Sequence, residues 1–504
     1  MLRLISPEDM LSSEKHYFET SGVPSIKVME RAAQALADAA LTRFPEAQTV
    51  YIACGPGGNG GDGYACARLL KAKGKECIIY ASAPAKSPDA IENARRAAEC
   101  GIEILVGELP TEAPDLWIDC IYGTGLSRAP EGFALDLLCR IHYDHFKGSG
   151  AIACDIPSGL NGRTGEAYPG CIIADVTVTF QLPKYGLYLA DGLDMCGEII
   201  AADVGFPAEI FPEENICRIL PGDLRCLVPR RRRNIHKGSC GHLLIIAGSV
   251  GMAGAAALCA KAALRSGVGL ITIACPESIV PILQIHAPCA MCLPLSEKDG
   301  AICADALPAV TEALKGKSAV AIGPGLSRRA VPEIVQAVLE SGLPAVIDAD
   351  ALNIISENEE LKKLLKFHHI ITPHPGEAAR LLGYPCSDPI ADTQALAALG
   401  ASAVLKGASR VICGRNSCMV SSSGANGMAR GGSGDVLTGL LGGLLAASKA
   451  QLPALEVMAA FIAAVACEIH GLAGELAQEK YGSYAMNSAD IIDFLPEVFK
   501  KYVD

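Results

Sequence analysis

The sequence predicts an α/β protein built from two large domains, and three observations support this fold class. The chain has 504 residues, which is more than one ordinary hydrophobic core accommodates. Hydrophobic residues make up 50% of the chain and charged residues 19%, so there is enough apolar side-chain volume for two cores. Short β-like runs alternate with helical runs on both sides of an irregular stretch, which is typical of parallel sheets covered by helices.

The first domain is expected to cover residues 1–215. After a polar start, the periodicity predicts an amphipathic helix at residues 25–44 and a second helix at residues 64–73. The β-like runs that are expected to form its parallel sheet are residues 49–53, 77–81, 116–122, 151–156 and 176–180.

Residues 211–234 lose the periodicity and contain several prolines, so we interpret them as the domain junction. Four consecutive arginines at residues 230–233 are interpreted mainly as a solvated or interface segment, with only a minor role in attracting a nucleotide. The second domain is expected at residues 225–504. A helix at residues 255–266 is predicted among β-like runs at residues 243–247, 270–274, 319–322, 345–348, 369–372, 403–405, 410–413 and 419–422.

Charge, cysteine content and hydropathy exclude several classes of protein. A net charge of −12 argues against nonspecific nucleic-acid binding and favours small-molecule partners. The 21 cysteines are scattered through apolar runs, which indicates buried thiols in a reducing compartment and no disulfide framework. The longest apolar helical stretch, residues 458–467, is too short to span a bilayer, and the N-terminus lacks a signal-peptide core. We therefore expect a cytoplasmic protein that binds neither nucleic acid nor a membrane.

The most informative run is Asn-Gly-Met-Ala-Arg-Gly-Gly-Ser-Gly-Asp-Val-Leu-Thr-Gly at residues 426–439. Gly431, Gly432 and Gly434 allow backbone N–H groups to turn toward an anion, and the following apolar residues predict a helix whose positive end faces it. Asp435 would repel a phosphate at this place unless it had a task of its own, such as taking a proton from a substrate hydroxyl. Alternatively, Asp435 is an ordinary helix N-cap.

A second glycine-rich run, Cys-Gly-Pro-Gly-Gly-Asn-Gly-Gly-Asp-Gly at residues 54–63, lies between a predicted strand and a predicted helix. A loop at this position faces the crevice at the carboxyl ends of parallel strands, which suits a phosphate or a nucleotide. Asn59 and Asp62 stand inside the loop, unlike the distant acidic residue of dinucleotide-binding dehydrogenases. A conventional NAD dehydrogenase is therefore disfavoured.

Polar residues also follow two later strands of the first domain. Asp119 is followed by Gly-Thr-Gly at residues 123–125, and Asp155 is followed by Ile-Pro-Ser158. Oxygen ligands from Asn59, Asp119 and Ser158 would suit a hard cation, which leaves Asp155 for proton transfer. Each aspartate alone is better explained as a turn or cap residue, but three coordinated strand ends favour a site.

These three motifs resemble those of the NAD(P)H-hydrate epimerases over roughly residues 1–215. The resemblance implies a Rossmann-like fold, a potassium ion held by Asn59, Asp119 and Ser158, and Asp155 as the acid/base. The family usually has two asparagines in the first loop, so Gly58 is a departure that would loosen contacts to the nicotinamide. The implied hydrate-binding residues are Gly58, Asn59, Gly60, Gly61, Asp62, Gly123, Thr124, Gly125, Leu126, Ser127, Arg128, Ala129 and Asp155.

The second domain carries further markers, most of them after β-like runs: residues 248–255, 323–325, 348–353, 372–377 and 406–407. Lys406 can meet a phosphate as a point charge, and His374 can hydrogen-bond a polar ligand. Singly, the lysine is more often a surface residue and His374 could equally shape its loop. Their joint placement with Asp435 favours a site.

Together these markers resemble the ADP- or ATP-dependent NAD(P)H-hydrate dehydratases, which are similar in fold to ribokinase, from about residue 225 to the end. The tandem arrangement resembles the bifunctional NAD(P)H-hydrate repair enzymes of bacteria. The resemblance implies that Ala255, Gly325, His374 and Asp435 contact the hydrate. It implies nucleotide binding by Lys406, Gly407, Ala408, Ser409, Arg410 and Gly434.

The implied activity is repair of hydrated nicotinamide cofactors. The first domain would interconvert the R and S hydrates with K⁺, and the second would dehydrate the S form with Mg²⁺ and ADP as the phosphoryl donor. The family also suggests a homo-oligomer. The alternative is a ribokinase-like small-molecule kinase with a noncatalytic N-terminal binding module.

Overall fold

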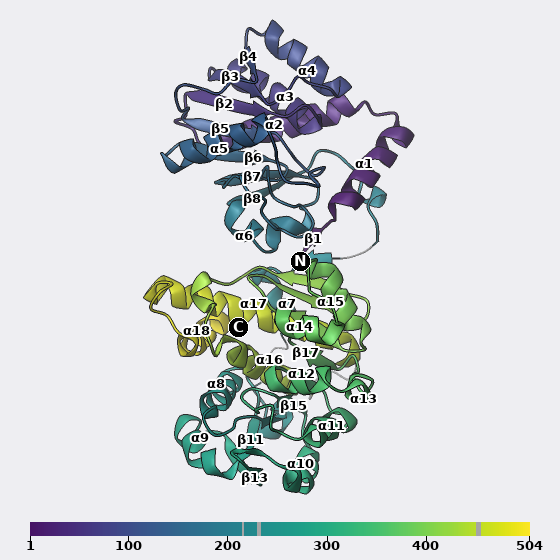
Figure 1. Cartoon of the computed structure of the whole chain (residues 1–504), viewed down its shortest axis with the longest axis vertical. Coiled ribbons are helices and arrows are strands. Elements are labelled where there is room, and N and C mark those ends of the chain that lie inside the picture. Colours follow the sequence, from purple (N-terminus) through teal and green to yellow (C-terminus); the bar gives the residue numbers. More distant parts are fainter. Residues whose placement is uncertain (214–215, 229–232, 450–454, 504) are drawn as a thin grey trace. The chain divides into compact units, whose positions relative to one another are not determined.

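The computed structural model describes residues 1–213, 216–228, 233–449 and 455–503 as two compact units. One unit comprises residues 3–215, and the other comprises residues 216–504 together with Met1 and Leu2. Both units are α/β, which confirms the predicted fold class (Figure 1). The expected junction falls partly outside the described residues, and so does most of the arginine run, of which only Arg233 is described.

The first unit contains a parallel sheet with the strand order β4-β3-β2-β5-β6-β7-β8. The chain moves outward from β2 to β4 and then returns to the other side of β2 at β5, which is the order of a Rossmann-like doubly wound sheet. The point of reversal lies between β2 and β5. The strands are β2 (Thr49–Cys54), β3 (Glu76–Ala81), β4 (Glu103–Val106), β5 (Leu116–Cys120), β6 (Gly150–Cys154), β7 (Val176–Phe180) and β8 (Glu198–Ala202).

Helices cover both faces of this sheet, and the alternation of side chains in β5 explains why (Figure 1). Ile118 packs in the core that contains Leu36 and Leu70, whereas its neighbour Trp117 packs in the opposite core with Leu137. The helices are α1 (Pro7–Ser21), α2 (Ser25–Arg43), α3 (Gly58–Ala72), α4 (Pro88–Glu99), α5 (Phe133–Phe146) and α6 (Gly192–Met195), and β1 is Leu2–Leu4.

The second unit contains a larger mixed sheet with the strand order β9-β20-β19-β18-β17-β16-β15-β10-β11-β12. The pairs from β18 to β12 are parallel, whereas β18, β19 and β20 are antiparallel neighbours. The strands are β9 (Ile216–Arg218), β10 (His242–Ile246), β11 (Leu270–Pro276), β12 (Met291–Leu295), β15 (Ala319–Ile322), β16 (Ala345–Ile347), β17 (His369–Ile371), β18 (Ser402–Leu405), β19 (Arg410–Cys413) and β20 (Cys418–Ser421), with a small pair β13 (Glu297–Lys298) and β14 (Ala301–Ile302).

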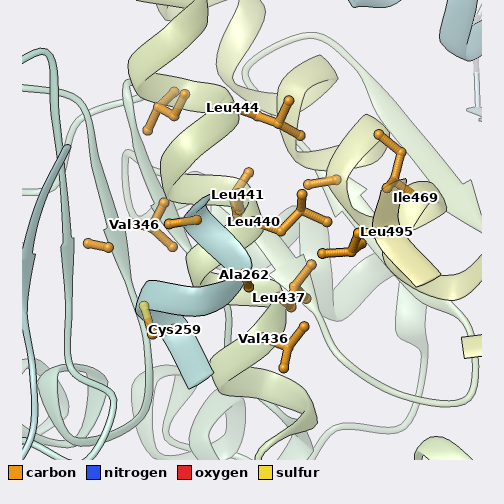
Figure 2. Packing of buried hydrophobic residues seen from close by; sticks show 14 of the residues in the cluster. Cys259, Ala262, Val346, Val436, Leu437, Leu440, Leu441, Leu444, Ile469 and Leu495 are labelled. Carbon is orange, nitrogen blue, oxygen red and sulfur yellow. The ribbon is translucent and has the colours of Figure 1, made fainter. Parts of the chain in front are cut away.

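The core of the second unit is organised around α16 (Figure 2). Leu440 and Leu441 of α16 are fully buried. An added Cβ at Gly439 would lie 2.0 Å from the carbonyl oxygen of Cys259, so the backbones of α16 and α8 are in close contact at this glycine. The helices are α7 (Leu224–Leu227), α8 (Ala253–Leu264), α9 (Val280–His286), α10 (Leu307–Leu314), α11 (Pro332–Glu340), α12 (Ala349–Ser356), α13 (Glu359–Lys362), α14 (Pro375–Leu382), α15 (Pro389–Ala398), α16 (Ser433–Lys449), α17 (Leu455–Tyr481) and α18 (Ser488–Tyr502).

Three expectations about local structure were wrong. The apolar helix expected at residues 458–467 is the 27-residue α17. Its segment Ala459–Tyr481 is long and apolar enough to cross a membrane, but 83% of the most apolar window is buried inside the unit, as in a core helix. One disulfide joins Cys413 to Cys418 across the β19–β20 hairpin, while the other 19 cysteines form no disulfide. Helix α3 begins at Gly58, six residues before the predicted start.

Candidate functional sites

The first glycine-rich run folds so tightly that two of its positions accept only glycine. An added Cβ at Gly55 would lie 2.0 Å from the carbonyl oxygen of Ile121, and one at Gly60 would lie 1.9 Å from the carbonyl oxygen of Gly55. The loop after β2 is therefore pressed against the loop after β5, at the point where the strand order reverses. Asn59 is carried into this crevice on the first turn of α3.

Asn59 and Asp155 meet around Gly123. An added Cβ at Gly123 would lie 2.9 Å from Oδ1 of Asn59 and 3.5 Å from Oδ2 of Asp155, so the absence of a side chain leaves a small polar space between them. The Nδ2 atom of Asn59 is buried and has no hydrogen-bond partner. A buried donor without a partner is unfavourable, and a bound polar ligand would satisfy it.

Asp119 and Ser158 form a buried oxygen cluster beside this space. Ser158 donates from its N–H to Oδ2 of Asp119 (2.8 Å) and from Oγ to Oδ1 (2.7 Å), and Oγ accepts the N–H of Tyr122 (2.8 Å). Asp119 is 1% exposed, and burial raises the pKa of its carboxyl to about 6 against the opposing effect of the Ser158 hydrogen bonds. A nearby cation would stabilise the ionised form of this carboxyl.

Asp155 is held by a buried lysine that the sequence did not single out. Lys184 is fully buried, and its Nζ lies 2.5 Å from Oδ1 of Asp155. Thr124 donates its hydroxyl to Oδ2 of Asp155, and Thr179 donates to Oδ1 (3.1 Å). Burial alone would raise the pKa of Asp155, but the charge and hydrogen bond of Lys184 outweigh it and hold the pKa below its usual value.

In the second unit, the expected glycine-rich run places Asp435 in the first turn of α16. Gly432 has φ +96°, a left-handed conformation that favours glycine, and it brings the chain around into the helix. An added Cβ at Gly434 would lie 3.5 Å from Nζ of Lys406 and 3.7 Å from Oδ2 of Asp348. The N-terminus of α16, Lys406 and the buried Asp348 therefore lie close together. The positive end of the helix and the lysine can hold an anion there.

Lys406 is paired with Asp348 and not with Asp435. Its Nζ donates to Oδ1 of Asp348 (2.6 Å), and Thr438 donates to Oδ2 of the same carboxylate (2.7 Å). Asp348 is 1% exposed, and its charge keeps the pKa of Lys406 above the usual value although burial opposes it. Burial and the negative charge of Asp348 raise the pKa of Asp435 to about 6, with Lys406 opposing them.

Two expected hydrate contacts, Ala255 and Gly325, lie side by side. An added Cβ at Gly325 would lie 3.0 Å from the Cβ of Ala255, and Gly325 itself has φ +60°. His374 caps α14, because its Nδ1 accepts the N–H of Gly376 (3.0 Å) while its own N–H donates to Glu377 (3.0 Å). The imidazole remains exposed, so its loop-shaping role leaves the ring accessible.

Two family models match the chain. A model described as NAD(P)H-hydrate dehydratase matches residues 243–497, and one described as YjeF-related protein N-terminus matches residues 25–186. A bifunctional NAD(P)H-hydrate repair enzyme of Moorella thermoacetica is 36% identical over 506 residues, covering 95% of this chain and 93% of that protein. This chain belongs to the bifunctional NAD(P)H-hydrate repair enzyme family.

Other members of the repair enzyme family match over a similar extent. The protein of Escherichia coli is 34% identical and covers 99% of this chain and 95% of its own length, and that of Coxiella burnetii is 35% identical with coverages of 94% and 95%. A crystal structure of the ADP/ATP-dependent NAD(P)H-hydrate dehydratase from Bacillus subtilis, co-crystallized with ATP/Mg²⁺, is 29% identical, covers 57% of this chain and 99% of that chain, and gives a TM-score of 0.47.

Some residues expected from the repair enzyme family are not brought to the two clusters. Arg410 is buried, and its guanidinium donates to the carbonyl oxygen of Ser423 and lies 3.5 Å from Nδ1 of His470, in the interior beside β20. Gly407 and Ala408 lie exposed in the turn before Arg410, and Ser409 is buried.

The structure places further charged residues around Asp155, and sequence reasoning missed two of them, Glu14 and Lys184. Glu14 on α1 faces the Asp155 pair, and burial raises the pKa of its carboxyl to about 7 despite the nearby charge of Lys184. Asp62, which was expected in the hydrate loop, is buried near Asp155, and burial raises its pKa well above the usual value. Lys184 follows the end of β7 by four residues, at the same edge of the sheet as the other polar strand ends, and that position was the available signal.

Proposed function

We propose that this chain repairs hydrated nicotinamide cofactors with two activities. The first unit interconverts the R and S forms of NAD(P)H hydrate, and the second dehydrates the S form to NAD(P)H. The observation that carries the proposal is that each unit places an aspartate suited to proton transfer in a site with a lysine, which is fully buried in the first unit and partly buried in the second, in a chain whose relatives match over both units. We assign residues 1–215 to the epimerase and residues 225–504 to the dehydratase.

In the first unit, Asp155 acts as the acid/base. The two hydrate epimers differ at the carbon that carries the hydroxyl group, so a bond at that carbon must break and re-form. Removal of the hydroxyl proton allows the C–N bond at this carbon to break with its electron pair on nitrogen, which leaves a carbonyl group. Attack of the nitrogen on the other face of the carbonyl and return of the proton give the other epimer. Thr124 donates its hydroxyl to Oδ2 of Asp155, so the hydroxyl of the hydrate can donate to the same oxygen. The buried amide of Asn59 supplies a hydrogen-bond donor on the other side of Gly123. The hydrate is bound by residues 58–62, residues 123–129 and Asp155.

A potassium ion fits the oxygen cluster of the first unit. Among the described residues, no group of three or more His, Cys, Asp or Glu side chains could hold a metal, so neutral oxygens must supply most ligands. Asn59 and Ser158 supply such oxygens. Burial disfavours the ionised form of the Asp119 carboxyl, and a bound cation would stabilise it. When bound, the ion supplies positive charge that orders these side chains beside the hydrate.

In the second unit, Asp435 acts as the base. It removes the proton of the hydrate's hydroxyl while the hydroxyl oxygen bonds to the terminal phosphorus of ADP and AMP leaves. The C–O bond then breaks with its electron pair on the departing phosphate, and loss of a ring proton restores the dihydronicotinamide. Lys406 and the N–H groups near Gly434 hold the phosphates, and Ala255, Gly325 and His374 contact the hydrate.

A magnesium ion accompanies the nucleotide in this proposal. It would be bound mainly by phosphate oxygens, with the buried carboxyl of Glu377, which faces Lys406, as a protein ligand. When bound, it supplies charge that stabilises the transferring phosphoryl group. Residues 406–410 form the turn beside the nucleotide; within it we assign the direct phosphate contact to Lys406, and to Arg410 a role in supporting the turn from inside the unit.

The proposal extends to the setting of the enzyme. We propose a cytoplasmic homo-oligomer that acts on free NAD(P)H hydrate and ADP and binds neither nucleic acid nor a membrane. The net charge of −12 supports the point on nucleic acid, and the burial of the apolar helix α17 within its own unit supports the point on the membrane.

Recovery of dihydronicotinamide absorbance from a mixture of R and S hydrates tests the function. With ADP, Mg²⁺ and K⁺, wild type should restore all absorbance, Asp435→Asn none, and Asp155→Ala only the S portion at the normal rate. Turnover with ATP alone would overturn the choice of ADP. If wild type restores nothing while it phosphorylates another alcohol to a stable product, the small-molecule kinase replaces the repair enzyme.

A further inference from the structure

Lys184 donates to three acceptors of the first unit. Besides Oδ1 of Asp155, its Nζ contacts Oγ1 of Thr179 and the carbonyl oxygen of Phe180, both at 3.3 Å. Burial of an unpaired charge is strongly unfavourable, so the fully buried Lys184 needs a negatively charged partner. Thr179 and Phe180 are neutral, so the pairing depends on Asp155.

The two oxygens of Asp155 have different surroundings. Oδ1 accepts from Lys184, from Thr179 (3.1 Å) and from the N–H of Phe180 (3.4 Å), so it is fully occupied. Oδ2 accepts from Thr124 and faces the space around Gly123. The backbone of Asp155 has φ +66°, a strained conformation for a residue with a side chain, so the surrounding structure holds it in place.

Other acidic groups surround Asp155 and oppose its ionisation. Glu14 faces it from α1, Asp62 faces it from α3, and the thiol of Cys154 precedes it on β6. Lys184 is thus the compensating charge in a site that otherwise gathers carboxyl groups. Without it, burial and like charges would both favour the protonated form of Asp155.

We propose that Lys184 is a positioning residue of the epimerase site, which keeps Asp155 ionised so that Oδ2 can accept the hydroxyl proton of the hydrate at neutral pH. This inference rests on the proposed epimerase function. Lys184 acts through Asp155 and does not itself exchange protons with the hydrate, because all of its contacts point to Asp155, Thr179 and Phe180.

A merely structural pair would behave differently from a pair that sets a charge. If the pair serves only packing, replacing Lys184 lowers stability but leaves the pH dependence of the remaining activity unchanged. If it sets the charge of Asp155, its loss moves the acid limb of the activity upward by about one to three pH units, the range caused by one close opposite charge.

The test is the pH–rate profile of R-to-S exchange by the full-length protein, measured without nucleotide so that dehydration is silent. Lys184→Met should move the acid limb upward by about one to three pH units, so that exchange falls by about 10-fold or more below the new limb and approaches the wild-type rate as the pH rises through neutrality. Lys184→Arg keeps the charge and should keep the limb near that of wild type. Lys71→Met, which removes a surface lysine of α3 that binds the carbonyl oxygen of Gly101, is the matched control.

Each outcome decides the matter. A Lys184→Met profile with the wild-type limb, or activity lost equally at every pH in a folded protein, would overturn the inference. Should Lys184→Met fail to fold, Lys184→Gln retains hydrogen bonds to Thr179 and Phe180 without the charge and must show the same upward shift. Absence of exchange by wild type would instead refute the epimerase function itself.

Discussion

The two sites use the same pair of residue types in opposite ways. In the first unit the buried lysine binds the proposed acid/base directly, because Lys184 lies 2.5 Å from Asp155. In the second unit the lysine binds a different carboxylate, Asp348, and leaves the proposed base Asp435 one step away. The consequence is a lowered pKa for Asp155 and a pKa of about 6 for Asp435.

This difference follows from what each lysine must do. A site that exchanges one proton with a neutral hydroxyl group needs an aspartate that is reliably ionised, and a direct ion pair achieves this. A site that also holds phosphates needs its lysine to face the nucleotide, so a separate buried aspartate orients it. The arrangement of Asp348 therefore keeps Lys406 from neutralising the base.

The largest effect on the difference between the two sites is expected from removal of the carboxylate partner of Lys406. In Asp348→Asn, Lys406 loses its anionic partner and can turn toward Asp435. Asp435 lies in the first turn of α16, next to Gly434, which is close to Nζ of Lys406. We expect dehydration to fall by about 10- to 100-fold and its acid limb to move to lower pH, as in the first site. Initial rates on purified S hydrate with ADP measure this effect. An unchanged limb would show that Asp348 does not govern the charge of Asp435.

Both sites also depend on glycines that allow close contact between backbone segments. A single substitution can disturb such a contact in one unit without changing the other. Gly60→Ala and Gly439→Ala each place a Cβ within about 2 Å of a backbone oxygen, which overpacking data suggest costs at least 1–3 kcal/mol of unfolding free energy. Gly60→Ala should impair exchange alone, and Gly439→Ala dehydration alone. Denaturant unfolding and both rates are the measurements. Gly57→Ala and Gly254→Ala, whose added Cβ atoms meet nothing within 4 Å, are the controls.

The sequence predicted the strands better than the side chains that face the sites. The strands 176–180, 319–322 and 410–413 match the observed β7, β15 and β19, because short buried runs rich in β-branched residues leave few alternatives. The start of α3 was missed because its first turns hold four glycines, which are poor helix formers. Here the close contacts between loops override the low helix propensity.

Buried polar residues account for the remaining errors. Lys184 belongs to no repeated motif, and its partner Asp155 lies 29 residues away, so only the fold brings the two together. Arg410 was expected at the nucleotide, but its side chain turns inward toward Ser423. Helix α17 was judged too short because Glu468 interrupts the apolar run, although Ser421 and Ser423 donate to its buried carboxylate (2.8 and 2.6 Å). Such pairings are tertiary contacts without a local signal.

A change of pH sharpens the comparison without any mutation. The pKa of Asp435 is raised to about 6, so its ionised, proton-accepting form is lost as the pH falls through that value. Lowering the pH from 7 to 5 should reduce dehydration by about tenfold, because the ionised fraction falls from about 90% to about 10%. The pKa of Asp155 lies below its usual value, so this group stays ionised over the same interval. Parallel acid limbs for the two activities would contradict the comparison.

The smallest expected effect concerns the position at which the first loop departs from its family. Gly58 begins α3, and an added Cβ there meets nothing within 4 Å, so Gly58→Asn should change the unfolding free energy by less than about 0.5 kcal/mol. The new amide stands next to Asn59 and adds a donor and an acceptor at the hydrate crevice. We expect the KM of exchange to fall a few-fold, with the kinetics of dehydration as the internal control. An unchanged KM would mean that the hydrate is held by Asn59, Thr124 and Asp155 without help from the first residue of α3.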